Sequence, residues 1–147
     1  MKVFVKACEL RDIEELVLEE ELSAVRDQFI EQIAPDPKGF FDDAFTLLFD
    51  GRPVACFGVF LHWEGVGRAW TFLSPEARSK PLSLHRSVKK ALGRYIDNNE
   101  IHRIEATVAT DFPEATRWVE RLGFDHECLM RKYAPGGFDH HLYARVQ

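Results

Sequence analysis

The sequence predicts one α+β domain over residues 1–147, built on a mixed sheet with elements in the order β-α-α-β-β-β-α-β-α-β-β. Three observations support this prediction. Residues 44–73 alternate as three strands joined by short turns, which indicates an antiparallel meander. An amphipathic helix then separates this meander from a further strand, which predicts a right-handed parallel pair in the middle of the sheet. Two closing strands joined by a Pro-Gly-Gly turn predict a second antiparallel region.

The first half of the chain begins with residues 1–7, which alternate as a strand. Asp12 and Glu15 have the spacing of a capping box, and the helical pattern from there continues to about residue 32. Its apolar stripe shifts, which predicts two helices or a bend near Ser23. Two prolines and a glycine predict a loop over residues 34–39. The strands of the meander are expected at residues 44–49, 53–63 and 68–73, with Asp50-Gly51 as the first turn.

The second half alternates helices and strands. A helix is predicted over residues 82–98 because its apolar residues recur on one side and its basic residues on the other. Residues 101–109 alternate as a strand. Thr110 to Pro113 then supply a capping residue and a first-turn proline for a further helix, and Gly123 is placed as its left-handed C-terminal cap. The closing strands are expected at residues 127–133 and 140–146.

Composition restricts the class of protein. No apolar run approaches the roughly 20 residues of a membrane span, and the alternating N-terminus is not that of a signal peptide. A net charge of −5 does not favour a protein that coats nucleic acid. Cys8, Cys56 and Cys128 are scattered in apolar surroundings, so we expect buried, inert thiols in a reducing, cytoplasmic setting. No metal-ligand spacing is present, and His140 and His141 should face opposite sides of their strand.

The segment from Ser74 to His85 joins a predicted strand to a predicted helix. A helix that starts after such a loop can hold phosphate, because the N–H groups of its first turn lack partners and its dipole favours an anion. Residues 78–94 carry six basic residues and no acidic one, in a chain that is acidic as a whole. The four basic residues on the helix are better explained as the solvated face of an amphipathic helix, whereas Arg78 and Lys80 lie inside the loop itself and are candidates for phosphate contact.

Two motifs resemble those of the GCN5-related N-acetyltransferases. Arg78-Ser79-Lys80-Pro81-Leu82-Ser83 resembles the pyrophosphate loop Q/R-x-x-G-x-G/A, and residues 111–124, DFPEATRWVERLGF, resemble N-x-x-A-x-x-L-Y-E-K-L-G-F. The element order also agrees with that fold from end to end. The chain is therefore identified as GNAT-like, with a central parallel pair of strands that splay apart. Its ending, RKY…DHHLYAR, is also similar to acetyltransferase-like proteins of podophages, some of them virion-associated.

The resemblance implies a site for acetyl-CoA, or CoA, between the splayed strands. The residues it assigns to the cofactor lie on the strand, loop and helices around that gap: Phe72, Leu73, Ser74, Arg78, Ser79, Lys80, Leu82, Ser83, Leu84, Asp111 and Trp118. Two glycine positions of the family loop are Pro81 and Ser83 here, and proline removes one N–H from the phosphate cradle. The family's Asn position is Phe112, and the position of its frequent general-acid Tyr is Val119, which cannot transfer a proton.

Two residues are candidates for proton handling. Glu105 lies on the strand between the two motifs, facing away from Ile104 and Ala106, and the resemblance places a carboxylate base on a central strand. His62 lies near a strand end and could also serve as a base. A surface or salt-bridged glutamate and a structural histidine explain the same residues.

Two functions remain open. The first is an acyl-CoA-dependent N-acetyltransferase that acts on a small-molecule or protein amine by direct attack of the amine on the thioester. The second is a catalytically inactive GNAT-like protein, in which the cofactor site is lost and the chain serves in binding or assembly. The first implies a cytoplasmic enzyme, and the second allows a virion-associated protein if the chain is phage-encoded. A homodimer is compatible with both.

Overall fold

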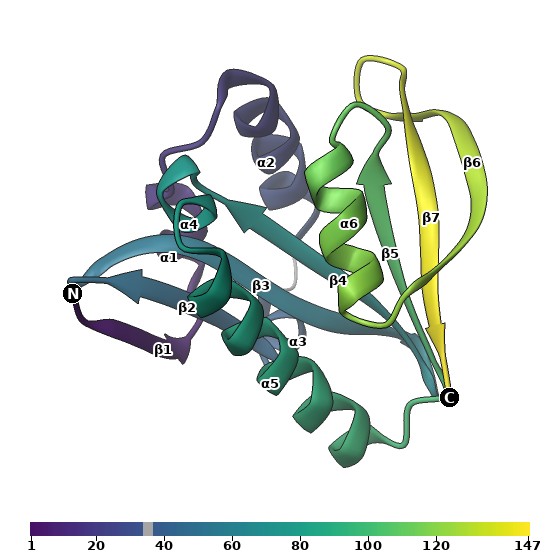
Figure 1. Ribbon diagram of the computed structural model, residues 1–147, viewed down its shortest axis with the longest axis horizontal. Helices are drawn as coiled ribbons and strands as arrows, with labels where there is room; N and C mark the ends of the chain where they lie inside the picture. The colour runs from purple at the N-terminus through teal and green to yellow at the C-terminus, as the bar shows by residue number, and fades with distance from the viewer. Residues whose placement is uncertain (34–36) are drawn as a thin grey trace.

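The computed structural model describes residues 1–33 and 37–147. It contains one seven-stranded sheet in the order β1-β2-β3-β4-β5-β7-β6 (Figure 1). The strands are β1 Val3–Ala7, β2 Ala44–Phe49, β3 Arg52–Trp63, β4 Val66–Leu73, β5 Arg103–Ala109, β6 Asp125–Ala134 and β7 Phe138–Val146. The helices are α1 Leu10–Glu15, α2 Glu20–Ile33, α3 Pro37–Phe40, α4 Pro75–Arg78, α5 Pro81–Asn99 and α6 Pro113–Arg121.

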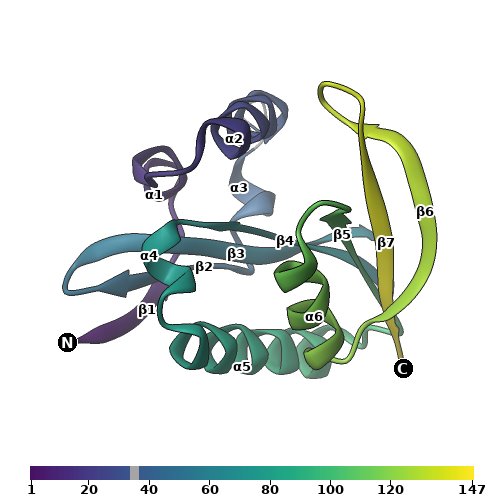
Figure 2. The same ribbon diagram turned by 45° about the horizontal axis from the view of Figure 1, so that its top comes forward.

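The helices cover the sheet from both sides. Figure 2 shows α1, α2 and α3 on one face and α5 and α6 on the other. Buried residues of β2, β3 and β5 form two apolar clusters with α5 and α6, and Ile104 at the centre of one of them is fully buried. A third cluster, which includes Ile13 and Leu16, packs beneath α1 and α2. No helix among residues 1–33 and 37–147 is long and apolar enough to cross a membrane.

The predicted sheet is confirmed. Strands β1 to β4 pair in an antiparallel meander, β4 and β5 are parallel, and β7 pairs antiparallel with both β5 and β6. The parallel pairing joins only Val66–Arg68 to Arg103–Glu105, although both strands continue well beyond it. Figure 1 shows β4 and β5 diverging from the end of the sheet near the C-terminus. The two strands therefore enclose a wedge-shaped gap whose closed end is the Arg68–Glu105 pair.

The N-terminal helical segment differs from the prediction in detail. It forms two helices, but the break lies between Glu15 and Glu20 and not at Ser23. The capping interaction uses an earlier pair, because the backbone N–H of Glu9 donates to Asp12 Oδ2 at 2.9 Å and α1 ends at Glu15. Asp12 is buried, where it also meets Lys6 Nζ at 3.0 Å, so tertiary contacts of this carboxylate decide where the helix begins.

Three further local predictions need correction. Of the predicted loop at 34–39, residues 34–36 lie outside the described residues and Pro37–Phe40 is a short helix. The N-cap of α6 is Phe112, without a side-chain capping bond, and not the polar residues before it. The segment between β4 and α5 is not a plain loop, because it contains α4. Gly123 does adopt the predicted left-handed conformation, with φ of +95°.

Candidate active site at the closed end of the strand gap

The closed end of the gap faces the layer of α1, α2 and α3. Ile104 is buried with residues of α5 and α6, so the alternation of β5 turns Glu105 to the opposite face. Trp70 packs against Phe29 of α2, with ring centroids 5.4 Å apart, so Arg68, two residues earlier on β4, lies on that same face. The strand pairing thus places a guanidinium and a carboxylate side by side at the point where the strands separate.

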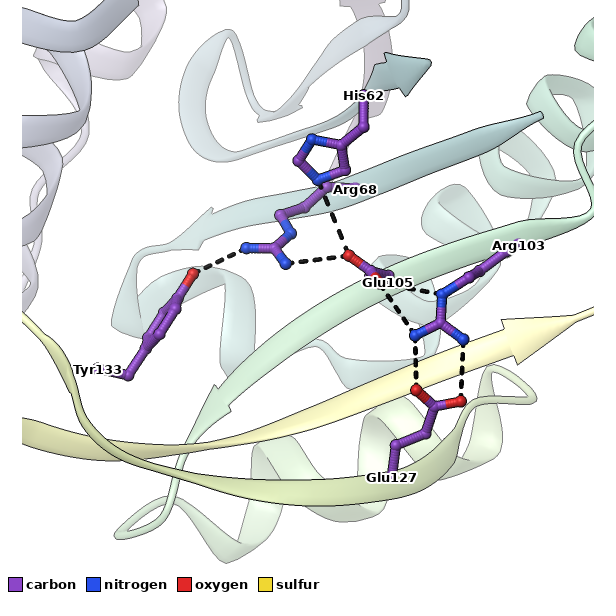
Figure 3. Close-up of polar contacts among 6 residues, drawn as sticks. All are labelled: His62, Arg68, Arg103, Glu105, Glu127 and Tyr133. Carbon is purple, nitrogen blue, oxygen red and sulfur yellow. Dashed lines mark hydrogen bonds and ion pairs between the residues drawn. The ribbon is translucent and has the colours of Figure 1, made fainter. Parts of the chain in front are cut away.

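Six polar side chains form a connected network at this point (Figure 3). Arg68 Nη2 donates to Glu105 Oε1 at 3.0 Å, and Arg103 Nε donates to Glu105 Oε2 at 2.9 Å. Arg103 continues to Glu127 through two hydrogen bonds of 2.9 and 2.5 Å. His62 Nε2 lies 3.8 Å from Glu105 Oε1, and Arg68 Nη1 donates to the phenol oxygen of Tyr133 at 2.8 Å. Residues from four strands therefore belong to one network centred on the Glu105 carboxylate.

The charges of this network fix the state of Glu105. Burial by itself would raise the pKa of the Glu105 carboxyl, but the hydrogen bonds and positive charges of Arg68 and Arg103 outweigh it, so its pKa lies below the usual value. The hydrogen bonds to Glu127, followed by those to Glu105, raise the pKa of Arg103. Glu105 is consequently an anion at neutral pH. A carboxylate held in this form is a weak base.

We expect Glu105→Gln to lower the free energy of unfolding by about 1–3 kcal/mol at pH 7, because charge-assisted hydrogen bonds from two arginines are lost. The folded-state pKa of Glu105 is depressed, so its charge stabilises the fold above the unfolded-state value of 4.5. This stabilisation is lost as the pH falls through the folded-state pKa. Urea denaturation across pH 3–7 should therefore show wild type and Glu105→Gln converging towards the acid end.

The matched control is Glu127→Gln, which removes an exposed carboxylate that also pairs with Arg103. Its effect on unfolding should be smaller than that of Glu105→Gln, because solvent screens an exposed pair. A pH-independent difference between wild type and Glu105→Gln would contradict the assignment of Glu105 as the central anion of the network.

The two candidates for proton handling, Glu105 and His62, come from separate parts of the sequence and meet at this point. His62 also packs edge-on against Phe60, with ring centroids 5.3 Å apart, which orients the imidazole. Arg68 and Tyr133 belong to the same network but were not among the sequence candidates. The resemblance between the closing hairpin and the GNAT family points to the region of Tyr133, but no sequence pattern shows that its phenol reaches β4.

The proposed phosphate segment is more ordered than the sequence suggests. The side chain of Ser74 caps α4 by accepting from the N–H of Ala77 at 3.2 Å. Within this turn the N–H groups of Arg78, Ser79 and Lys80 donate to backbone carbonyls of residues 74–77. These three amides are therefore already satisfied. The Arg78 guanidinium is ion-paired with Glu19, so it reaches a ligand only by leaving this carboxylate.

The remaining anion-binding capacity lies at the start of α5. Pro81 occupies the first turn, where its missing N–H costs the helix nothing, and the N–H of Leu84 donates to the carbonyl of Lys80. The N–H groups of Leu82 and Ser83, in the first turn of this 19-residue helix, have no intrahelical acceptor. With the helix dipole and the adjacent ammonium of Lys80, they can hold a diphosphate.

The other residues assigned to the cofactor lie on β4, on α6 and in the turn before α6. Phe72 faces α2, packing against Phe29 with ring centroids 5.1 Å apart, whereas Leu73 packs on the α5 side. Beyond Arg68 the β5-facing edge of β4 has no strand partner among the described residues, so its backbone groups can bind an extended ligand. Trp118 of α6 packs against both apolar clusters on the α5 side, and its indole N–H is buried without an acceptor in the described part of the chain. Asp111 lies exposed in the turn before α6.

The cysteines only partly follow the prediction. Cys8 and Cys56 are buried, as expected, but Cys128 is exposed. Hydrogen bonding with Cys56 lowers the pKa of the Cys8 thiol, while the same interaction and burial raise the pKa of Cys56. Trp63, near the end of β3, is 69% exposed. Across residues 1–33 and 37–147, no three histidine, cysteine, aspartate or glutamate side chains are grouped to hold a metal ion.

Solved structures share this architecture over nearly their whole length. Ard1 from Thermoplasma volcanium is 13% identical to the chain, with a TM-score of 0.76 over 98% of this chain and 97% of that one. A GNAT-family acetyltransferase from Bacillus anthracis is 14% identical, with a TM-score of 0.73 over 99% and 95%. The chain has the GNAT acetyltransferase fold. The ribosomal-protein-S5-alanine acetyltransferase from Vibrio fischeri is also 14% identical, with a TM-score of 0.71 over 98% and 92%.

At these identities the likeness establishes the GNAT fold alone. No protein-family profile matches the chain, and no curated protein matches it. The assignment of a function to this GNAT fold therefore depends on the chemistry of the gap and of its closed end.

Proposed function

We propose that the protein is an N-acetyltransferase that moves an acetyl group from acetyl-CoA to an amine of a small molecule or a protein. The observation that carries this proposal is the wedge between β4 and β5, closed by the Arg68–Glu105 pair and open towards the N-terminus of α5. Acetyltransferases named for the acetylation of spermidine and of a ribosomal-protein alanine share the fold, which supports an amine as the acceptor.

Acetyl-CoA would lie along the unpaired edge of β4. The amides of Leu82 and Ser83, with Lys80, would hold its diphosphate. Trp118 would donate its unpartnered indole N–H to the part of the cofactor that lies in the gap. The cofactor supplies an activated acetyl group. Backbone N–H groups of β4 that face the gap beside its closed end would polarise the carbonyl of that group.

His62 and Glu105 would prepare the acceptor. An amine must be neutral to attack a carbonyl, so a base has to remove its proton. We assign this base to His62, because Glu105 remains an anion that stabilises the imidazolium formed when His62 takes the proton. The separation of 3.8 Å is longer than a hydrogen bond and would shorten as His62 becomes charged.

Calorimetric titration with CoA and acetyl-CoA tests the proposal. We expect binding in the micromolar range, and a ligand concentration of 100 Kd should add about 2.7 kcal/mol to the free energy of unfolding. For a chain of this size the melting temperature should rise by roughly 5–10 °C. Dephospho-CoA is the matched ligand for the contribution of the ribose phosphate. No heat and no thermal shift at millimolar CoA would exclude the transferase function.

A specific observation favours a second candidate, a GNAT-fold protein that binds a partner without turnover. The amides of Arg78, Ser79 and Lys80 are bonded within α4, and Arg78 is ion-paired with Glu19, so fewer groups remain for phosphate. This candidate predicts neither CoA binding nor release of free thiol when acetyl-CoA is offered with a panel of amines. Binding of CoA together with thiol release would exclude it.

A further inference from the structure

The closing hairpin carries an irregularity that the fold does not require. The register of β6 against β7 shifts between Met130 and Ala134, so extra residues of β6 bulge from the ladder. Within the bulge Lys132 has φ of +54°, a conformation that costs a side-chain-bearing residue roughly 1 kcal/mol or more. The side chain of Asp139 holds this conformation by accepting the N–H of Lys132 at 2.8 Å. A bulge of this kind redirects the next side chain.

That next side chain is Tyr133. Its phenol oxygen lies 2.8 Å from Arg68 Nη1, although β6 and β4 are separated in the sheet by β5 and β7 (Figure 3). The Tyr133 ring also packs against His140, with ring centroids 5.3 Å apart. Burial lowers the pKa of His140, which favours the neutral form of this imidazole. The bulge and its neighbours thus hold the phenol at the closed end of the gap.

The direction of the Arg68 contact decides what Tyr133 can do. A guanidinium has donors only, so the phenol oxygen must accept in this bond and its own hydrogen is not used. No acceptor for that hydrogen is present among residues 1–33 and 37–147. Tyr133 therefore presents a proton at the closed end of the gap. Val119 occupies the helix position where the GNAT resemblance expects a proton donor, and it has no proton to give.

We propose that Tyr133 is the proton donor to the departing sulfur of the acyl thioester, an assignment that rests on the proposed function. The amine nitrogen forms a bond to the carbonyl carbon, and the carbon–sulfur bond breaks with its electron pair passing to sulfur. The Tyr133 proton moves to that sulfur. The proton that His62 removes from the ammonium is released to solvent. The second proton, which the nitrogen loses as the amide forms, passes through solvent to the phenolate, so the products are the free thiol, the amide and one proton.

Tyr133→Phe tests this assignment, because it keeps the ring and its contact with His140 and removes only the hydroxyl. We expect kcat to fall roughly 10- to 100-fold with KM for the amine nearly unchanged. A second readout does not depend on turnover: the pKa of the thiol of bound CoA, followed by the ultraviolet absorbance of the thiolate. Loss of the phenol donor should raise this pKa by about one unit relative to wild type.

Tyr143→Phe is the matched control, since Tyr143 lies on the α6 side and its hydroxyl is bonded to Glu120 at 3.3 Å. It should change neither kcat nor the thiol pKa. If wild type fails to bind CoA, the proposed function itself is wrong. If wild type binds CoA and turns over, but Tyr133→Phe leaves both readouts at wild-type values, only the assignment of Tyr133 is overturned.

Discussion

His62→Ala is expected to lower kcat for amine acetylation about 100-fold, with the CoA affinity unchanged. A positioned base contributes roughly this factor, which corresponds to about 2.7 kcal/mol of transition-state stabilisation. The Glu105 carboxylate beside it is already committed to two arginines and has a lowered pKa, so it cannot take over as an efficient base. The loss should be large for an amine that is protonated at the assay pH and small for an amine that is already neutral, as measured by the release of free thiol.

His126→Ala is the matched control for this prediction. His126 lies exposed on β6, where its Nε2 is 2.9 Å from His141 Nδ1, and it does not contact the network around Glu105. Its kcat should equal that of wild type with both amines. If His62→Ala retained wild-type kcat with the protonated amine, the base would have to be a group other than His62.

Ser83→Asp is expected to weaken CoA binding about 10- to 100-fold and to abolish most of the thermal shift that CoA produces. The substitution places a carboxylate in the first turn of α5, beside the amides assigned to the diphosphate. One pair of like charges near a protein surface is unfavourable by up to about 4 kcal/mol at 4 Å, and salt reduces this value. The same carboxylate suits the positive end of the helix dipole, so the free protein should be as stable as wild type or slightly more stable.

Ser83→Ala separates the charge from the loss of the hydroxyl. It keeps the backbone amides of the helix terminus and should change the CoA affinity only a few-fold. Calorimetry with CoA and melting of the free proteins give both quantities for each variant. Unchanged CoA affinity in Ser83→Asp would place the diphosphate away from α5 and contradict the assignment of Leu82 and Ser83.

Much of the fold could be predicted because its patterns are local. Asp50-Gly51 predicts the first hairpin, and both residues do adopt positive φ in the turn. The stripe of residues 82–98 predicts α5 within one residue at each end. The predicted capping pair at the start of the first helix was wrong, because the side chain that decides where this helix begins has partners elsewhere in the chain. Asp12, for example, is held by Lys6 and by Thr46, whose hydroxyl donates to it at 3.1 Å.

The candidate site was predicted only in part. Glu105 and His62 could be proposed from residue type and place, but their proximity follows from the pairing of β3, β4 and β5. Tyr133 could not be assigned, because its contact with Arg68 depends on a bulge and on a positive φ at Lys132. Lysine rarely adopts a positive φ, so the sequence does not indicate this conformation. The sequence also left the backbone amides of residues 78–80 available for phosphate, whereas in the structure they donate to backbone carbonyls of residues 74–77.

The sequence by itself determined the order of the strands and of the helices other than α3 and α4, including the strand–helix–strand arrangement of β4, α5 and β5, because alternation, amphipathic stripes and turn residues act over a few neighbouring positions. Only the tertiary structure decided that an arginine pair holds Glu105 as an anion, that His62 lies beside it while Tyr133 contacts Arg68, and that two amides of α5 remain for an anion. These properties depend on distances between side chains far apart in the chain and on the desolvation of charge, which no local pattern encodes.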